Sequence, residues 1–176
     1  MSKFTKKLIM AISPIVLLIP VTALAVDYGG VGGRPASPRP DNPRTKSIFV
    51  YEIKPSGQIQ DGITVFNDTA QPKTVAIESV DSVISSDGGF ACAQAVDQKK
   101  DLGGWIQISQ KQVALGPKES VTVPFTVAVP KKADIGEHDG CITIQDVSAN
   151  AAAQKSNGVV LGFRSALRTI VTIPGA

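Results

Sequence analysis

The chain has 176 residues, of which 18 are Lys or Arg, 15 are Asp or Glu and one is His. The first 25 residues hold three of the lysines and no acidic residue, so the remainder carries 15 charges of each sign. A nucleic-acid-binding domain needs a basic surface of its own, and this balanced composition argues against a nucleic-acid partner.

The first 25 residues predict a secretory signal peptide. Three lysines precede the mostly apolar run Leu8–Leu24, and Ala23 and Ala25 are small residues at the positions that signal peptidase reads. The alternative is an uncleaved anchor, which would need about 20 continuous apolar residues, whereas Pro14 and Pro20 interrupt this run. We expect cleavage after Ala25 and an exported product, extracellular or cell-wall associated, with no transmembrane span after cleavage.

Residues 26–47 differ in composition from the rest of the chain. Glycines come first and prolines follow, with Arg34, Arg39, Arg44 and Lys46 among them. The segment lacks the apolar periodicity that a core requires, which predicts a disordered Gly/Pro-rich spacer. A basic arm that touches an anionic surface, such as wall polymer or lipid headgroups, is the alternative.

Residues 48–176 are long enough to form one domain with a substantial core. Alternating apolar residues predict strands at Ile48–Lys54, Gln58–Asn67, Lys73–Ser82, Ser120–Val129, Gly140–Ile144 and Val159–Ile173, with short candidates at Trp105–Ile108 and Gln112–Leu115. The helix-prone stretch Ser148–Lys155 is expected to be a loop. About seven strands with frequent turn signals predict an all-β fold, a single immunoglobulin-like antiparallel β-sandwich.

Cys92 and Cys141 are the two cysteines of the chain. An even number of cysteines in an exported protein predicts a disulfide bond. Closing a loop of roughly 50 residues is worth about 4 kcal/mol in the chain-entropy model. A reactive thiol pair is the alternative, but the Cys-x-x-Cys spacing that such pairs use is missing.

The sequence carries no catalytic constellation. His138 is the sole histidine, and no second histidine or free cysteine completes a transition-metal site, so we interpret it as part of a solvated turn. A Gly-x-Ser-x-Gly elbow is missing as well. The triplet Asn67-Asp68-Thr69 matches a glycosylation signal and is equally an ordinary turn. We therefore predict a non-enzyme without metal or cofactor.

Three residues are candidates for ligand binding. Trp105 is predicted in the core, with an exposed platform for a sugar ring or a partner as the alternative. Arg164 and Arg168 lie four residues apart on a predicted strand and hence on one face. This face is either plain solvent-exposed surface or a pair of cations placed for a carboxylate-bearing polymer.

Several motifs together resemble the peptidoglycan-binding domain of the WxL-interacting proteins. They are Tyr51–Pro55, Gly62–Asn67, Val113–Val123 and Gly140–Ile144, with Arg164 near the end. The resemblance implies a β-sandwich that binds cell-wall peptidoglycan. That family also has a second domain, which engages WxL proteins, and a C-terminal anchor; neither follows here within 176 residues. The fold therefore carries over better than the WxL partnership.

Two functional hypotheses follow. The first is an exported, non-enzymatic module that binds peptidoglycan or a cell-surface protein. The second is a chaperone-like or assembly subunit for surface proteins, which would act by adding a strand at an exposed sheet edge. An enzyme is a third class that the sequence does not favour.

Overall fold

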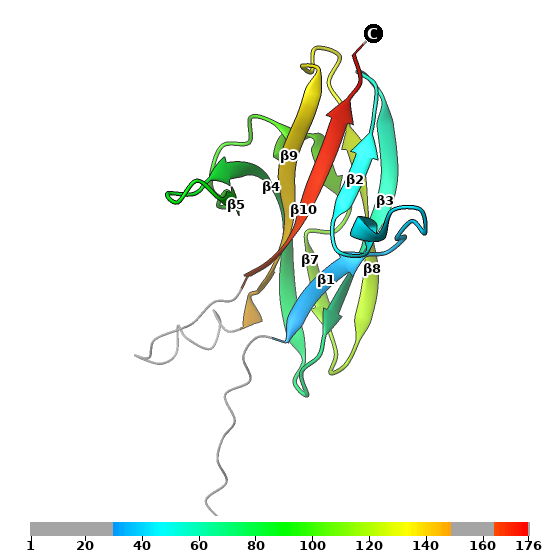
Figure 1. Ribbon diagram of the computed structural model, residues 1–176. Helices are drawn as coiled ribbons and strands as arrows, with labels where there is room; N and C mark the ends of the chain where they lie inside the picture. The colour runs from blue at the N-terminus through cyan, green and yellow to red at the C-terminus, as the bar shows by residue number, and fades with distance from the viewer. Residues whose placement is uncertain (1–29, 149–163, 176) are drawn as a thin grey trace, which may run out of the picture.

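The computed structural model describes residues 30–148 and 164–175 (Figure 1). The predicted signal peptide, most of Ser148–Lys155 and the first part of the predicted strand Val159–Ile173 lie outside these residues. The described chain forms two β-sheets that face each other across a common core, which confirms the predicted immunoglobulin-like β-sandwich.

The first sheet has four strands and the second has six. In spatial order the first sheet consists of β1 (Val31–Pro35), β3 (Gln58–Asn67), β8 (Ser120–Ala128) and β6 (Ile106–Ile108). The second consists of β2 (Phe49–Glu52), β10 (Arg164–Ile173), β9 (Gly136–Asp146) and β4 (Lys73–Ile84), with β5 (Phe90–Cys92) and β7 (Gln112–Leu115) both paired to β4. The β2–β10 pair is parallel and the other pairs are antiparallel.

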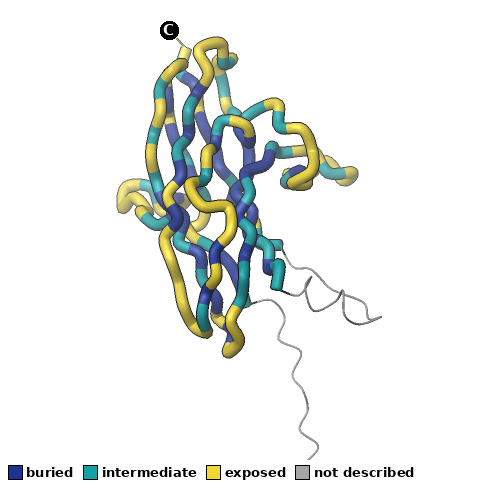
Figure 2. Tube along the Cα trace, turned by 180° about the vertical axis from the view of Figure 1, so that it is seen from behind, coloured by how far each residue is buried: buried dark blue, intermediate teal, exposed yellow. Residues whose placement is uncertain are grey.

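The core lies between the sheets because alternate residues of each strand point inward. Phe125 of β8 meets Phe49 of β2 edge to face, with ring centroids 5.0 Å apart. Ile63 and Ile144 are fully buried, one from each sheet. Figure 2 shows the burial concentrated along the central strands, with exposed residues at the loops and turns.

The predicted spacer over residues 26–47 is wrong from residue 31 onward. β1 pairs with β3 along its whole length, and a short 3-10 helix follows at Pro43–Lys46. A Cβ atom on Gly33 would lie 2.3 Å from Cδ1 of Ile144. At Gly33 the backbone of β1 therefore packs directly against the core without a side chain. For this reason the strand shows no alternation of apolar side chains in the sequence.

One predicted strand begins with a helical turn instead. Trp105 ends α1 (Leu102–Trp105), and β6 starts at the next residue. In α1, Leu102 is fully buried, and a Cβ on Gly103 would lie 2.4 Å from the backbone of Val80. The glycine allows the turn to pack directly on β4. Neither α1 nor any other helix in the described ranges has the length and apolarity to cross a membrane.

Candidate functional site

The end of β4 leaves the sandwich and forms a protruding hairpin with β5 (Figure 1). β4 pairs with β9 as far as Asp81. Beyond that point it pairs with β5, and Ile84 lies opposite Phe90. We refer to residues 82–92 as the braced hairpin, because contacts with β9 and β10 hold it in place.

The turn of the braced hairpin is closed by its own polar groups. The Asp87 carboxylate accepts hydrogen bonds from the Ser85 hydroxyl and, at 3.1 Å, from the Gly89 amide. These bonds, led by that of Ser85, hold the pKa of the Asp87 carboxyl below its ordinary value. Gly88 has φ of +81°, a conformation that favours glycine. The turn is thus formed without help from the core.

The first brace is the predicted disulfide between Cys92 of β5 and Cys141 of β9, which the structure confirms. The two Cα atoms are 5.9 Å apart. Cys141 is fully buried, and together with Val80 and Ala93 it forms a small apolar cluster separate from the main core. The disulfide therefore fixes the base of the hairpin onto the outer face of the second sheet.

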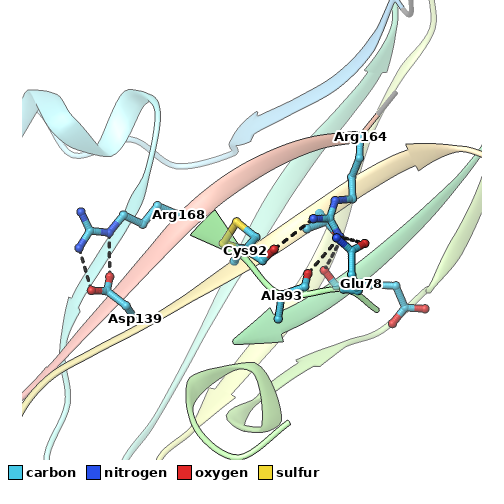
Figure 3. Close-up of a disulfide and its surroundings, with 9 residues drawn as sticks. Glu78, Cys92, Ala93, Asp139, Arg164 and Arg168 are labelled. Carbon is cyan, nitrogen blue, oxygen red and sulfur yellow. Dashed lines mark hydrogen bonds and ion pairs between the residues drawn. A yellow bond between two sulfur atoms is a disulfide. The ribbon is translucent and has the colours of Figure 1, made fainter. Parts of the chain in front are cut away.

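The second brace is Arg164 at the start of β10 (Figure 3). Its guanidinium group donates hydrogen bonds to the carbonyl oxygens of Cys92 at 3.2 Å and Ala93 at 3.0 Å. A third bond, at 3.3 Å, reaches the side-chain oxygen of Gln94. One arginine thereby satisfies backbone acceptors in the last residue of β5 and in the residue after it.

The third brace is Arg168, four residues further along β10 and on the same face as Arg164. It binds the Asp139 carboxylate through two bonds of 2.7 Å, and Glu137 lies 3.5 Å away (Figure 3). The hydrogen bonds that Arg168 donates to the Asp139 carboxylate raise the pKa of its guanidinium. The guanidinium carbon also lies 4.6 Å from the centre of the Phe90 ring. Arg168 thus connects the tip of the hairpin to β9.

The sequence correctly placed Arg164 and Arg168 on one face of a strand. Their cationic groups already have partners within the chain, namely the hairpin carbonyls and Asp139. Binding of an external polymer carboxylate by this pair stays a prediction. The role in bracing the hairpin was not predicted, since residues 70 or more positions apart meet only in the folded chain.

The braced hairpin displays large apolar side chains to solvent. Val83 is 44% exposed, Ile84 84% and Phe90 45%, and Val96 just beyond the hairpin is 92% exposed. Of the six large apolar side chains that are exposed among the described residues, these four lie within 14 positions of one another. Sequence analysis missed this surface. The signal was available in the apolar pair Val83-Ile84 and in Phe90, which flank an Asp-Gly-Gly turn.

An acidic hollow lies beside the hairpin, where β4 separates from β9. Its volume is about 480 Å³. The lining residues come from the end of β4, the loop before α1 and β9, and they are Asp81, Ser82, Val83, Ala93, Asp97, Gln98, Lys100, Asp101 and Asp139. Four carboxylates and one lysine therefore face this hollow, which we call the acidic split.

The prediction that His138 belongs to a solvated turn is wrong. His138 lies in β9 with its side chain 13% exposed, and its ring stacks at a tilt on Trp105 with centroids 4.6 Å apart. Nδ1 is 2.8 Å from a carboxylate oxygen of Asp101, and Nε2 is 2.9 Å from the Asp134 carbonyl oxygen. Burial lowers the pKa of His138, but these two hydrogen-bond partners outweigh it and leave the pKa raised.

Trp105 is half-buried and packs against the main core, in agreement with the predicted core position. One side of its ring is covered by His138. A role as a platform for a sugar ring stays a prediction, and the imidazole of His138 limits the ring surface that such a ligand would use.

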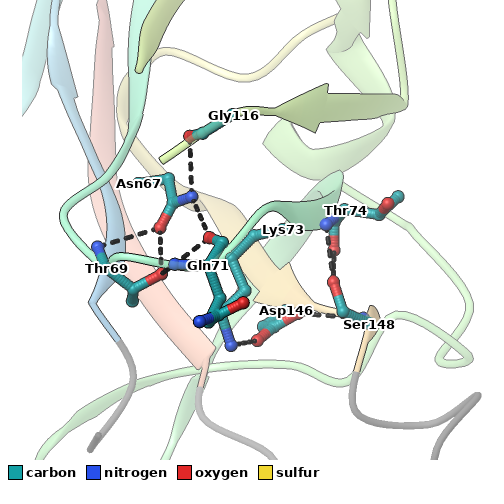
Figure 4. A network of polar contacts seen from close by, with 8 residues as sticks. All are labelled: Asn67, Thr69, Gln71, Lys73, Thr74, Gly116, Asp146 and Ser148. Atoms are coloured by element: carbon teal, nitrogen blue, oxygen red, sulfur yellow. Dashed lines mark hydrogen bonds and ion pairs between the residues drawn. The ribbon is translucent and has the colours of Figure 1, made fainter. Parts of the chain in front are cut away.

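A separate polar network holds the turn between β3 and β4 (Figure 4). Asn67 is fully buried, and its amide donates to the carbonyl oxygens of Gln71 and Gly116, both at 2.8 Å. Its oxygen accepts from the backbone amide of Thr69 at 3.0 Å and from the hydroxyl at 2.7 Å. Asn67 is therefore the centre of a turn, and its burial removes it as a glycosylation acceptor.

The sequence matches no protein-family model, and no curated protein matches it. Solved structures do share the fold. A family 123 glycoside hydrolase from Clostridium perfringens has TM-score 0.53 and 10% identity over 83% of this chain and 28% of its own. The chain thus spans little more than a quarter of that hydrolase, and the low identity indicates a shared fold alone.

Two other structures are similar to this chain to a lesser degree. A PapD-like domain of human CEP192 has TM-score 0.49 and 10% identity over 95% of this chain and 98% of its own. The Escherichia coli chaperone DraB has TM-score 0.47 and 18% identity over 73% of this chain and 53% of its own. The matched part of this chain therefore spans about half of DraB.

Proposed function

We propose that this chain is an exported, non-enzymatic binding module whose ligand is another protein at the cell surface. The braced hairpin is the binding element. The observation that carries the proposal is that the hairpin exposes Val83, Ile84 and Phe90 while a disulfide and two arginines hold it in place. A cell-surface protein as ligand comes from the first hypothesis from the sequence, and binding by strand addition comes from the second, a chaperone-like or assembly subunit.

Exposed apolar side chains favour a protein ligand because burying them releases about 25 cal/mol per Å². A contiguous patch of them marks an interaction surface. Ile84 and Phe90 are cross-strand partners and therefore project on the same side of the hairpin. The braces reduce the ordering cost of binding, since the hairpin is already fixed before a partner arrives.

The residues on which a wall-polymer ligand would depend are engaged inside the chain. Trp105 stacks on His138, and Arg168 pairs with Asp139. Arg164 donates to carbonyl oxygens of the hairpin. A polymer bound by these groups would compete with contacts that hold the fold, whereas a protein on the hairpin would leave them intact. Peptidoglycan binding is therefore the alternative outcome of the experiment below.

Export and the lack of catalysis are part of the same proposal. A disulfide between Cys92 and Cys141 is typical of proteins that fold in an oxidising compartment. It agrees with the predicted signal peptide. Both ring nitrogens of His138 have partners within the chain, so the sole histidine acts as a structural link between β9 and the loops beside it.

The test places a photo-crosslinking amino acid at Ile84 in producing cells. We expect one discrete crosslinked protein of the cell surface. The control is the same amino acid at Ile135, which is 70% exposed and lies on the loop before β9, away from the hairpin; it should give no such product. A second arm incubates the purified chain with isolated peptidoglycan. The proposal is overturned if peptidoglycan retains the chain and crosslinking at Ile84 yields no protein.

A further inference from the structure

Along its β4 rim, the acidic split has backbone groups that lack a partner among residues 30–148 and 164–175. In an antiparallel pair, alternate residues direct their N–H and C=O groups to the neighbouring strand. The amide of Ser85 donates to the Gly89 carbonyl oxygen, and that of Ala93 to the Asp81 carbonyl oxygen, both at 2.9 Å. By alternation, Ser82 and Ile84 direct their backbone groups away from β5 and toward the split.

The β9 rim of the split is open as well. The ladder between β4 and β9 ends with Asp81 opposite Gly140. β9 continues to Gly136, and over this last part it pairs with β10 on its other side. If the register of the β4–β9 ladder continued by one more pair, Asp139 would lie opposite Ser82. Two strand edges therefore face each other across the hollow.

The floor and rims of the split are negatively charged. Asp81, Asp97, Asp101 and Asp139 line it, with Lys100 as the cation among the lining residues. Arg168 compensates the charge of Asp139, with a guanidinium nitrogen 2.7 Å from a carboxylate oxygen. An excess of carboxylates remains, which attracts a cationic ligand and repels an acidic one.

We propose that the acidic split is the docking slot for one extended segment of the partner protein, and that this segment carries a lysine or arginine. The segment adds as a strand to the free β4 edge at Ser82 and Ile84. Its apolar side chains cover the braced hairpin, and its cationic side chain enters the hollow between Asp97 and Asp139. This inference rests on the proposed function and specifies the partner's chemistry.

The two parts of the slot have separate roles: the β4 edge supplies backbone hydrogen bonds, and the acidic hollow selects for charge. Main-chain hydrogen bonds give affinity for any extended peptide, and side-chain pockets select the sequence. An acidic segment of equal length would pair with the same backbone groups but meet the excess negative charge of the hollow. The slot therefore discriminates by charge more than by length.

Two synthetic probes test the inference. One is a hexapeptide of alternating valine and threonine that begins with lysine, and its twin begins with glutamate. Nuclear magnetic resonance titration of the exported chain follows the backbone amides. We expect the lysine peptide to shift the amides of Ser82, Ile84 and Asp139, and the glutamate peptide to leave them in place. Equal binding of the two peptides, or shifts confined to other strands, would overturn the inference.

Matched variants separate the backbone from the side chain. Ile84→Pro removes an N–H that points away from β5, so the hairpin keeps its own hydrogen bonds. Ile84→Ala removes the side chain and keeps the N–H. We expect at least a tenfold loss of lysine-peptide affinity in the proline variant and a smaller loss in the alanine variant, since one removes the added strand and the other one apolar contact. Equal affinities contradict strand addition.

The charge is tested at Asp97, which is exposed and accepts a hydrogen bond from the Gln94 amide at 2.8 Å. Asp97→Asn keeps an acceptor and removes the charge. We expect an affinity for the lysine peptide about two to five times lower, the range for one exposed ion pair. An unchanged affinity overturns the charge assignment. If crosslinking at Ile84 still traps a surface protein while neither peptide shifts the split, the proposed function stands and this inference is wrong.

Discussion

The sandwich and the braced hairpin are held by different forces. In the sandwich, apolar side chains from two sheets bury each other, and Ile63, Val65 and Ile144 have no exposed surface. In the hairpin, Ile84 keeps 84% of its surface exposed, and order comes from a disulfide, two arginines and a self-closed turn. Because the braces do not depend on Val83 and Ile84, these two exposed side chains stay available for a partner.

This contrast predicts that stability and function reside in different residues. Substitutions in the sandwich should lower the free energy of unfolding of the whole domain. Substitutions at the braces should loosen the hairpin and leave the sandwich folded. Substitutions on the exposed surface of the hairpin should change neither, and should affect binding alone.

The largest effect is expected for Phe125→Ala. Phe125 is 2% exposed and packs edge to face on Phe49. Removing a buried aromatic side chain leaves a cavity, and the usual cost is about 3–5 kcal/mol. Chemical denaturation should show this loss with a single transition. A variant that unfolds as the parent protein does would mean that the two sheets do not share one core.

Reduction of the Cys92–Cys141 disulfide is the next largest change. The chain-entropy model assigns about 4 kcal/mol to a loop of this size, and typical values are about 2–4 kcal/mol. Because the disulfide joins the hairpin to β9, hydrogen exchange should accelerate first at Ala93, whose amide donates to the Asp81 carbonyl oxygen. Amides of β3 and β8 should stay protected. Uniform acceleration across both sheets would show that the hairpin and the sandwich open together.

The sequence predicted the sandwich well and the hairpin poorly, for a physical reason. Strands such as Gln58–Asn67 can be predicted because the residues that point into the core are apolar and alternate with polar ones. The predicted bounds of this strand agree with β3. The hairpin contributes little to the main core, so no period marks it. Arg164 and Arg168 bind residues that are far away in the sequence, and such contacts cannot be predicted from the spacing of residues along the chain.

The errors at β1 and His138 have a related origin. Gly32 and Gly33 pack closely against neighbouring side chains in β1, which pairs with β3. Because these residues are glycines, the composition of the segment predicted a spacer instead of a strand. His138 was assigned to a turn because acidic and glycine residues surround it in the sequence. It is instead held by Asp101, which comes from the loop before α1. At β1 and at His138, contacts with distant parts of the chain determine the structure, and the local sequence predicts a different one.

Asn67→Ala should destabilise the sandwich end by about 1–3 kcal/mol, because the substitution leaves buried backbone groups without their partner. Asn67 makes hydrogen bonds to Gln71, Gly116 and Thr69 (Figure 4). The matched control is Asp68→Ala at the exposed neighbour, whose stability should stay near that of the parent protein. Thermal unfolding measures both. Equal losses in the two variants would contradict the central role of Asn67.

A smaller, pH-dependent effect is expected at His138. Its pKa is raised in the folded chain above the ordinary 6.5, so the folded state binds the proton more tightly than the unfolded state. The resulting stability is fully present below pH 6.5 and is lost as the pH rises through the folded-state pKa. His138→Gln should remove this dependence in denaturation curves taken across that range. A variant with the same pH dependence as the parent protein would assign it to another group.

The smallest effect on stability, and the largest on binding, is expected at the tip of the hairpin. Ile84→Thr keeps a β-branched side chain on a strand and removes apolar surface that is already 84% exposed. The free energy of unfolding should change by less than about 0.5 kcal/mol, as at other surface sites. Affinity for the surface protein that crosslinking identifies should fall sharply in this variant, whereas the same substitution at Ile135 should leave that affinity unchanged. If Ile84→Thr instead unfolds the hairpin, Ile84 belongs to the braces and the separation of order from exposed surface is wrong.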